Sequence, residues 1–389
     1  MQLSKSVSSE KERKLGLSSI FKSKIATILI ATVAIWVLFT VLTGGNFLTT
    51  RNLSNLFRQM SITGILAIGM VFVIILGEID LSVGSTLGLL GGIAAILNVW
   101  FGFSAIPTMV ITLILGIIIG AWNGYWIAFR NVPSFIVTLA SMLVFRGILI
   151  GITGGNTVAP LTADFKTVGQ AYLPTVFGYV LVVLAVVGSA YLILGNRKNK
   201  IKYNIEVKSM AFDVSIIAAI GILSLGLVVI LNDYQGFPIP AFIMLVIALI
   251  LSFVGTKTIF GRRVYGIGGN RDAARLSGIN VKKHILVVYS MVGLLAAVAG
   301  ILLTARLNAG SVAAGQNAEL DAIASCVIGG ASLAGGTGSV VGALVGALVM
   351  ASVDNGMSMM NTPTFWQYIV KGLILLIAVW IDISSKNKK

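Results

Sequence analysis

The sequence predicts an all-α fold, a polytopic transmembrane helical bundle of about 10 to 12 spans with broken or re-entrant helices. Hydrophobic residues make up 57% of the chain and charged residues only 11%, whereas soluble domains carry about 25% charged residues. The apolar residues come in runs of about 17 to 23, long enough for a helix to cross a hydrocarbon core of about 30 Å. Glycine is abundant, at 44 residues, and proline is scarce, at 7. This composition suits helices that pack closely through small faces.

The first apolar run extends from Ile25 to Leu42 and follows a basic segment. No small-residue cleavage site ends this run, so we expect a retained first helix and not a removed signal peptide. The Gly-rich region 320–353 is predicted to add either two crossings or a re-entrant pair. The chain is thus predicted to be a single transmembrane domain, 25–383, between basic cytoplasmic tails, 1–24 and 384–389. By length and hydrophobicity we expect further spans near residues 61–77, 82–98, 108–128, 132–151, 174–194, 211–231, 238–255, 284–306 and 364–381.

Basic residues indicate the orientation of the chain. Cytoplasmic loops are enriched in Lys and Arg, so the segments rich in them are predicted to lie inside, together with both termini. The opposite face keeps Arg51, Arg58 and Lys166. The net charge of +15 is therefore matched to the anionic leaflet of the inner membrane, and no nucleic-acid partner is expected. Most of the 28 basic residues lie in the two tails and in loops 130–131, 195–210 and 257–283.

Side chains suited to catalysis or metal binding are scarce. Cys326 and His284 are the only cysteine and histidine, so we expect no disulfide, no metal site and no catalytic triad. No Gly-Lys pair is followed by Ser or Thr, so the chain lacks the phosphate loop of ATP-binding proteins. The run GIGG at 266–269 resembles part of a dinucleotide fingerprint, but Arg271 occupies the position of the third glycine. We therefore expect neither an enzyme nor a cofactor.

Two Gly-rich segments echo each other, GEIDLSVGS at 77–85 and GGASLAGGTGS at 329–339. Interrupted helices are tolerated at membrane depth where protein or a water-filled cavity satisfies the freed backbone groups. Either the echo is a chance similarity, with Asp80 capping the next helix, or these are the paired broken helices that line the route of a transporter. On the second interpretation the following residues lie on the route: Glu78, Asp80, Gly84 and Gly336.

Two clusters carry side chains that suit cyclic polyols, namely flat aromatic rings for C–H faces and amides or carboxylates for hydroxyl groups. Trp122 and Asn123 form the first cluster, with Trp126 one helical turn from Trp122. Tryptophan also concentrates at membrane interfaces whatever the function, so interfacial anchoring is the alternative to solute contact. The second cluster comprises Asp354, Asn355, Trp366 and Gln367, with Phe365 beside them.

The longest basic loop, 257–283, reads KTIFGRRVYGIGGNRDAARLSGINVKK. It predicts a short helix, because Asp272 favours a helix N-terminus and Gly278 provides a stop. With no buried face of its own, this helix is expected to fit a groove on a partner protein, with Ala274 as a small side chain at the contact. The alternative is a solvated loop without a partner.

The same residues match a pattern. Asp272, Ala273, Ala274 and Gly278 have the acidic-Ala-Ala, three-residue, Gly spacing of the loop by which ABC importer permeases dock their ATPase, with Asp in place of the usual Glu. From about residue 50 onward, the chain resembles the monosaccharide permeases of ABC importers, of the ribose and xylose type. The stretches that carry the resemblance are ITGILAIGMVFVIILGEIDLSVGS (62–85), VPSFIVTLASMLVFRGILIGIT (132–153), GRRVYGIGGNRDAARLSGIN (261–280), ELDAIASCVIGGASLAGGTGSVVGA (319–343) and DNGMSMMNTPTFWQYIVKG (354–372).

The resemblance implies the pore subunit of a binding-protein-dependent importer, with the greatest likeness to family members that carry D-xylose. It also implies a second permease copy, a separate ATP-binding subunit that holds the ATP, and an extracytoplasmic sugar-binding protein. Ribose or another small sugar is the alternative substrate. An ion-coupled secondary sugar transporter is the alternative mechanism; it would use Glu78 and Asp80 for the ion and would not need the docking loop.

Overall fold

A computed structural model of the chain describes residues 24–386, so most of the two predicted tails lies outside the described residues. The prediction of an all-α, polytopic bundle is confirmed. Beside nine long helices, the described part has two shorter apolar ones, α2 (Lys24–Leu42) and α4 (Val83–Val99). The nine that are long and apolar enough to cross a membrane are α3 (Thr50–Ile75), α5 (Ala105–Arg130), α6 (Ser134–Thr153), α8 (Thr175–Lys202), α9 (Met210–Tyr234), α10 (Ile239–Lys257), α13 (Val281–Leu307), α15 (Val340–Met359) and α16 (Thr364–Lys386).

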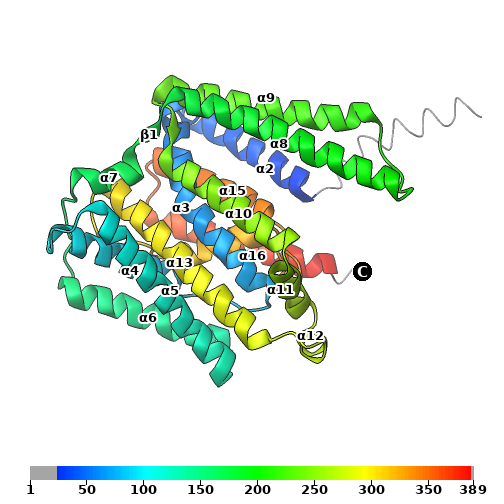
Figure 1. The fold of residues 1–389 in the computed structure, drawn as a ribbon. Coiled ribbons are helices and arrows are strands. Elements are labelled where there is room, and N and C mark those ends of the chain that lie inside the picture. The colour runs from blue at the N-terminus through cyan, green and yellow to red at the C-terminus, as the bar shows by residue number, and fades with distance from the viewer. Residues whose placement is uncertain (1–23, 387–389) are drawn as a thin grey trace, which may run out of the picture.

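Helix α3 lies at the centre of the bundle (Figure 1), packed against α13, α15, α14 (Ala318–Ile328) and α10. Glycine lets α13 approach α5 closely. A Cβ added at Gly116 would lie 2.6 Å from the carbonyl oxygen of Gly293, so a larger residue would push the helices apart. Close backbone approach through small residues is how helices pack in lipid, where the hydrophobic effect gives them no reason to associate. The outer helices α8, α9 and α16 remain mostly exposed, which suits surfaces that face lipid.

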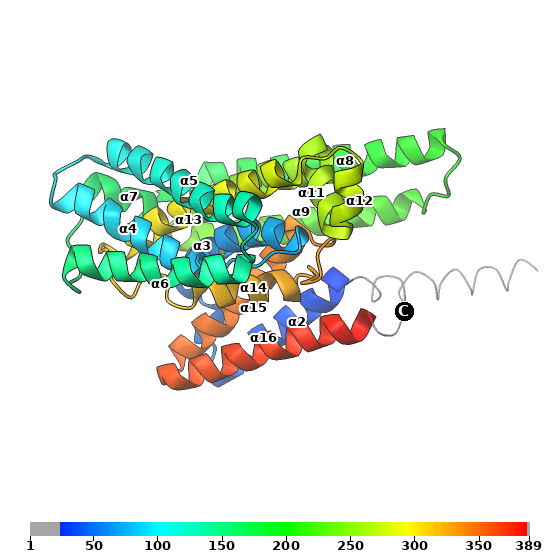
Figure 2. The same ribbon diagram turned by 90° about the horizontal axis from the view of Figure 1, so that it is seen from below.

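The basic segments that the structure describes gather at one end of the molecule. Figure 2 shows the turn between α8 and α9, the short helices α11 (Ile259–Gly269) and α12 (Arg271–Leu276), and the end of α16 on the same side. At the opposite end, which we call the outer end, lie α7 (Ala163–Gln170), the connection between α4 and α5, and the connection between α15 and α16. The 3-10 helix η1 (Asn46–Leu48) and the antiparallel two-residue strands β1 (Tyr172–Leu173) and β2 (Phe237–Pro238) complete the fold.

Two helices extend beyond the apolar runs that predicted them. Helix α3 begins at Thr50 instead of near residue 61, because its first turns are polar and a hydrophobicity pattern does not detect them. Helix α8 continues to Lys202, so most of the predicted loop 195–210 is helical. The helix can continue beyond the apolar run because the charged ends of its Lys and Arg side chains reach water. The predicted loop 195–210 is thus non-helical only at residues 203–209.

The ambiguous region 320–353 contains one short helix, one break and most of one long helix. Helix α14 has 11 residues, about 16 Å of rise, and is too short to cross a bilayer. The chain reaches α14 through a non-helical segment, residues 308–317, that runs alongside α4. A Cβ added at Gly310 would lie 2.5 Å from the Cβ of Ala95, and Gly315 lies against the backbone of Gly84. The sequence patterns predicted the break at 329–339 but missed this earlier one.

Candidate functional site

The two Gly-rich breaks meet. The backbone N–H of Gly336 donates a hydrogen bond of 2.9 Å to the carbonyl oxygen of Ile75, at the end of α3. A Cβ added at Gly335 would lie 3.1 Å from the Cα of Gly77. Both Gly335 and Gly336 have positive φ, 88° and 74°, a conformation that side chains disfavour. The structure therefore brings segments 77–85 and 329–339 together at one crossing point, although residues 86–328 separate them.

Helix α11 packs onto this crossing point. A Cβ at Gly268 would overlap the carbonyl oxygen of Ile75 and lie 2.7 Å from the nitrogen of Gly336. The hydroxyl of Tyr265 donates a 2.7 Å hydrogen bond to the carbonyl oxygen of Gly338. Burial raises the pKa of the Tyr265 hydroxyl, so it stays protonated and remains a donor. The GIGG run thus packs against the two Gly-rich breaks, and is not a nucleotide-binding turn.

An ion pair joins α12 to the first break. Arg271 Nη1 lies 2.9 Å from Glu78 Oε1, and the Glu78 side chain is only 10% exposed. Glu78 therefore has a partner in the predicted docking loop. Spacing in the sequence gave no sign of this pairing, because the two residues are far apart in the chain and only the fold brings them together.

Helix α12 has the local structure that its sequence predicts. Asn270 Oδ1 accepts a hydrogen bond from the Ala273 N–H at the N-terminus, and Gly278, with φ of 80°, follows the helix end. The expectation that the helix has no buried face of its own is wrong. Ala274 is 4% exposed and packs within the main apolar core. The exposed side chains of the helix are those of Arg271, Asp272, Ala273, Arg275 and Leu276, the last of which is 85% exposed.

Asp80 and Asn123 belong to one buried hydrogen-bond chain. Asp80 Oδ1 accepts bonds from the backbone N–H and the hydroxyl of Ser82, at 2.8 and 2.6 Å. Asn123 Nδ2 donates to Ser82 Oγ at 2.9 Å and its Oδ1 accepts from Ser141 at 2.7 Å. The chain ties the first break to α5 and α6. Asp80 thus bonds to Ser82, the residue before α4, but makes no capping hydrogen bond to a residue of that helix. Trp122 points outward and is 54% exposed.

The second predicted cluster separates into three environments. Asp354 and Asp321 both pair with Lys371, at 2.8 and 2.9 Å, which ties α16 to α15 and α14. Asn355 exchanges two hydrogen bonds with Asn52 of α3, of 2.8 and 3.1 Å. Trp366 is half exposed and Gln367 donates to the carbonyl oxygen of Thr362. The structure does not bring these four residues together around one cavity.

Gly84 lies where the irregular segment 308–317 comes closest to α4. A Cβ there would overlap Glu319 Oε2 and the carbonyl oxygen of Gly315. From the other side, Arg146 Nη1 donates to the carbonyl oxygens of Val312 and Ala314, at 2.6 and 3.0 Å. These bonds satisfy backbone acceptors that no helix satisfies. Arg146 is therefore a structural residue that the sequence left without a role.

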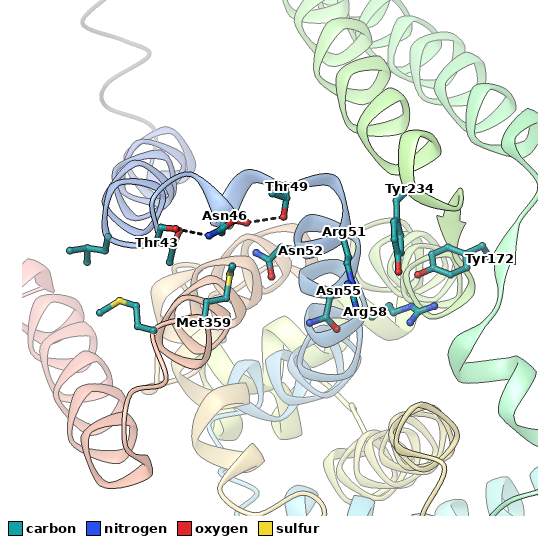
Figure 3. Close-up of a pocket in the computed structure, with 12 residues that line it drawn as sticks. Thr43, Asn46, Thr49, Arg51, Asn52, Asn55, Arg58, Tyr172, Tyr234 and Met359 are labelled. Atoms are coloured by element: carbon teal, nitrogen blue, oxygen red, sulfur yellow. Dashed lines mark hydrogen bonds between the residues drawn. The ribbon is translucent and has the colours of Figure 1, made fainter.

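A cavity of about 640 Å³ opens at the outer end of the molecule. It lies where α2, η1 and α3 meet the ends of α15 and α9 (Figure 3). No Asp or Glu is among its lining residues. The lining consists of Leu42, Thr43, Asn46, Thr49, Arg51, Asn52, Asn55, Arg58, Tyr172, Tyr234, Met359 and Met360. None of these residues was a predicted solute contact, although Asn355, which was, lies directly behind Asn52.

Residues 52–379 match the family described as branched-chain amino acid transport system / permease component. The chain belongs to this permease family. It is 57% identical to a xylose transport system permease protein of Haemophilus influenzae, over 92% of this chain and 96% of that one. Against the xylose permease of Escherichia coli K12 the identity is 53%, over 96% and 95%. A ribose import permease of Bacillus subtilis is 36% identical, over 87% and 86%. No solved structure matches the chain.

These relatives are transport permeases and not enzymes, so the chain is a multi-pass membrane transport protein. The resemblance to monosaccharide permeases is confirmed at the level of the family.

Proposed function

We propose that the chain is the membrane-spanning permease of an ABC importer that carries D-xylose across the cytoplasmic membrane. Identity to the two xylose permeases, 57% and 53%, well above the 36% to a ribose permease, supports D-xylose over ribose. ATP is hydrolysed by a separate subunit, and an extracytoplasmic binding protein delivers the sugar. The observation that carries the mechanism is that α11 and α12 are bonded to both Gly-rich breaks.

The proposal gives α12 two faces with different tasks. Its inner face, Ala274, packs on the permease core, and its outer face presents Asp272, Ala273 and Leu276 to the ATPase. An exposed leucine flanked by a small residue suits a groove on a partner. Movement of the ATPase then reaches the breaks through the Arg271–Glu78 ion pair and the Tyr265–Gly338 hydrogen bond. In this arrangement the end that carries α12, together with both termini, faces the cytoplasm.

The non-helical segment 308–317 is the observation that favours a dimer of two permease copies. It runs alongside α4 and keeps exposed positions, Ala313 and Gln316. Irregular backbone at membrane depth is tolerated only where protein covers it or water reaches it, because lipid cannot satisfy its hydrogen bonds. We therefore place the dimer contact and the water-filled route between two copies at this segment, with Gly84 and Glu319 behind it.

Reconstitution tests this function. The permease is placed in liposomes with its ATPase and its binding protein, and ATP hydrolysis is measured with D-xylose, D-ribose and no sugar. We expect the strongest stimulation from D-xylose, and uptake that stops on ATP depletion but survives collapse of ion gradients. Uptake that follows an ion gradient without ATP would refute the ABC mechanism. Stronger stimulation by D-ribose would refute the proposed substrate.

A further inference from the structure

The outer cavity concentrates positive charge where the chain has little of it. Arg51 and Arg58 are two of the few basic residues predicted for the outer face, and both line this one cavity. Neither takes part in an ion pair with a described residue. Arg306 adds a third guanidinium at the edge, with Nη2 lying 3.4 Å from Asn55 Oδ1. Arg51 is exposed, whereas Arg58 is partly buried, so the unpaired charge of Arg58 is the costly one.

Sequence spacing aligns these groups on one helix face. Arg51, Asn55 and Arg58 stand at i, i+4 and i+7 in the first turns of α3, and Asn52 lies beside Arg51. Figure 3 shows these side chains on the side of α3 that faces the cavity, with Tyr172 and Tyr234 next to Arg58. This polar face explains why α3 begins before its apolar run.

Aromatic rings complete one wall. The Arg58 guanidinium lies over the Tyr172 ring, 4.3 Å from its centroid. The Tyr172 and Tyr234 rings meet edge to face with centroids 6.0 Å apart. Arg58 also donates from Nη2 to the carbonyl oxygen of Gln170, whereas its Nε is buried and has no hydrogen-bond partner among the described residues. The guanidinium is thus positioned by stacking and one hydrogen bond, and keeps a donor that the protein leaves unused.

We propose that this cavity is a binding site for the sugar within the permease itself, and that it takes a cyclic polyol of monosaccharide size. The volume lies within the range of about 300 to 1,000 Å³ that is typical of small-molecule sites. Sugar hydroxyl oxygens accept from the arginines and amides, and sugar hydroxyl hydrogens donate to amide and tyrosine oxygens. The tyrosine rings offer apolar contact to the C–H groups of the sugar. A simple anion would accept hydrogen bonds from the arginines and amides but could not donate to the amide and tyrosine oxygens.

Asn52, which lines the cavity, connects it to the helix that follows the second Gly-rich break. Asn52 exchanges two hydrogen bonds with Asn355 of α15, the helix that follows the second break. The start of α15 in turn follows Gly338, which accepts the bond from Tyr265 of α11. A sugar bound beside Asn52 would therefore lie next to one end of α15, and the other end of α15 follows Gly338, which is bonded to α11.

The inference rests on the proposed function, so its test separates the two. The permease alone, in lipid nanodiscs, is titrated with radiolabelled D-xylose, and inorganic phosphate serves as the anion probe. Arg51→Gln and Tyr234→Leu alter the cavity, while Lys166→Gln and Tyr179→Leu remove a basic side chain and a tyrosine outside it. We expect D-xylose to bind, the cavity variants to weaken binding by at least about tenfold, and the controls to stay within about twofold. All variants are compared by the amount of folded permease recovered.

Three results would overturn the inference. The first is a wild-type permease that binds no D-xylose alone yet supports D-xylose-stimulated ATP hydrolysis in the complete importer, which would leave the proposed function intact. The second is binding of phosphate, and not of D-xylose, that the cavity variants abolish, which would make this an anion site. The third is equal loss of D-xylose binding in cavity and control variants.

Discussion

Two neighbouring alanines of α12 have opposite environments. Ala273 is exposed and Ala274 is buried in the core of the permease. Successive residues of an α-helix lie about 100° apart around its axis, so adjacent positions readily face different surroundings. The motif that contains both residues does not distinguish their roles, whereas the fold does.

Arginine at these two positions should therefore have different effects. Ala273→Arg puts a long charged side chain on the outward face, so we expect normal amounts of membrane-inserted permease and little co-purifying ATPase. Ala274→Arg forces a charge into an apolar core without a partner, which costs several kcal/mol, so we expect less folded permease. Membrane yield and ATPase co-purification measure both effects. Equal behaviour of the two variants would contradict the assignment of the faces.

At the scale of elements, α11 is the connection between α12, the proposed docking helix, and the two Gly-rich breaks. Its Gly268 allows close approach to Ile75, and its Tyr265 bonds to Gly338. The remainder of the helix contributes Val264 and Ile267 to the core. A helix held this firmly transmits displacement as a rigid unit, because a close-packed core yields little.

Removing one hydroxyl tests this transmission. Tyr265→Phe keeps the ring but deletes the hydrogen bond to Gly338, worth about 0.5 to 1.5 kcal/mol. We expect unchanged docking of the ATPase and a two- to tenfold loss of sugar-stimulated ATP hydrolysis, which is about what that energy corresponds to. Tyr179→Phe, on the exposed part of α8, is the matched control and should have no effect. Full activity in Tyr265→Phe would exclude this bond from coupling.

At the scale of the whole molecule, the arrangement of charge agrees with the proposed orientation. The α8–α9 turn, α12 and the end of α16 share one end (Figure 2). The residues that line the outer cavity belong to the opposite end. Segments that are far apart in sequence thus bring basic residues to the same end of the molecule. An anionic cytoplasmic leaflet attracts residues of this charge.

Cysteine accessibility tests this orientation in intact cells. Asn199→Cys and Ser277→Cys place exposed thiols at the basic end, and Asn156→Cys places one at the outer end. An impermeant thiol reagent should label only the variant at residue 156. The native Cys326 is fully buried and should give little background. Labelling of residue 199 or 277 from outside would reverse the proposed topology.

The sequence by itself determined the class of the protein, most of its helices, the short helix α12 and the family. These follow from local properties: apolar runs long enough to span a bilayer, basic loops between them, and the spacing of Asp272, Ala273, Ala274 and Gly278 within one short segment. The echo between segments 77–85 and 329–339 also identified two real interruptions. Polar helical turns, such as those at the start of α3, were missed because hydrophobicity does not report them.

Only the tertiary structure decided what the polar residues contact. Glu78 meets Arg271, Asn52 meets Asn355, and Lys371 holds two carboxylates from other helices. Such pairs join residues tens to hundreds of positions apart, and periodicity along the chain has no information about which helices become neighbours. The outer cavity has the same origin, because its lining residues come from α2, η1, α3, β1, α9 and α15. Each element is encoded locally, but the space between them exists only once they have packed.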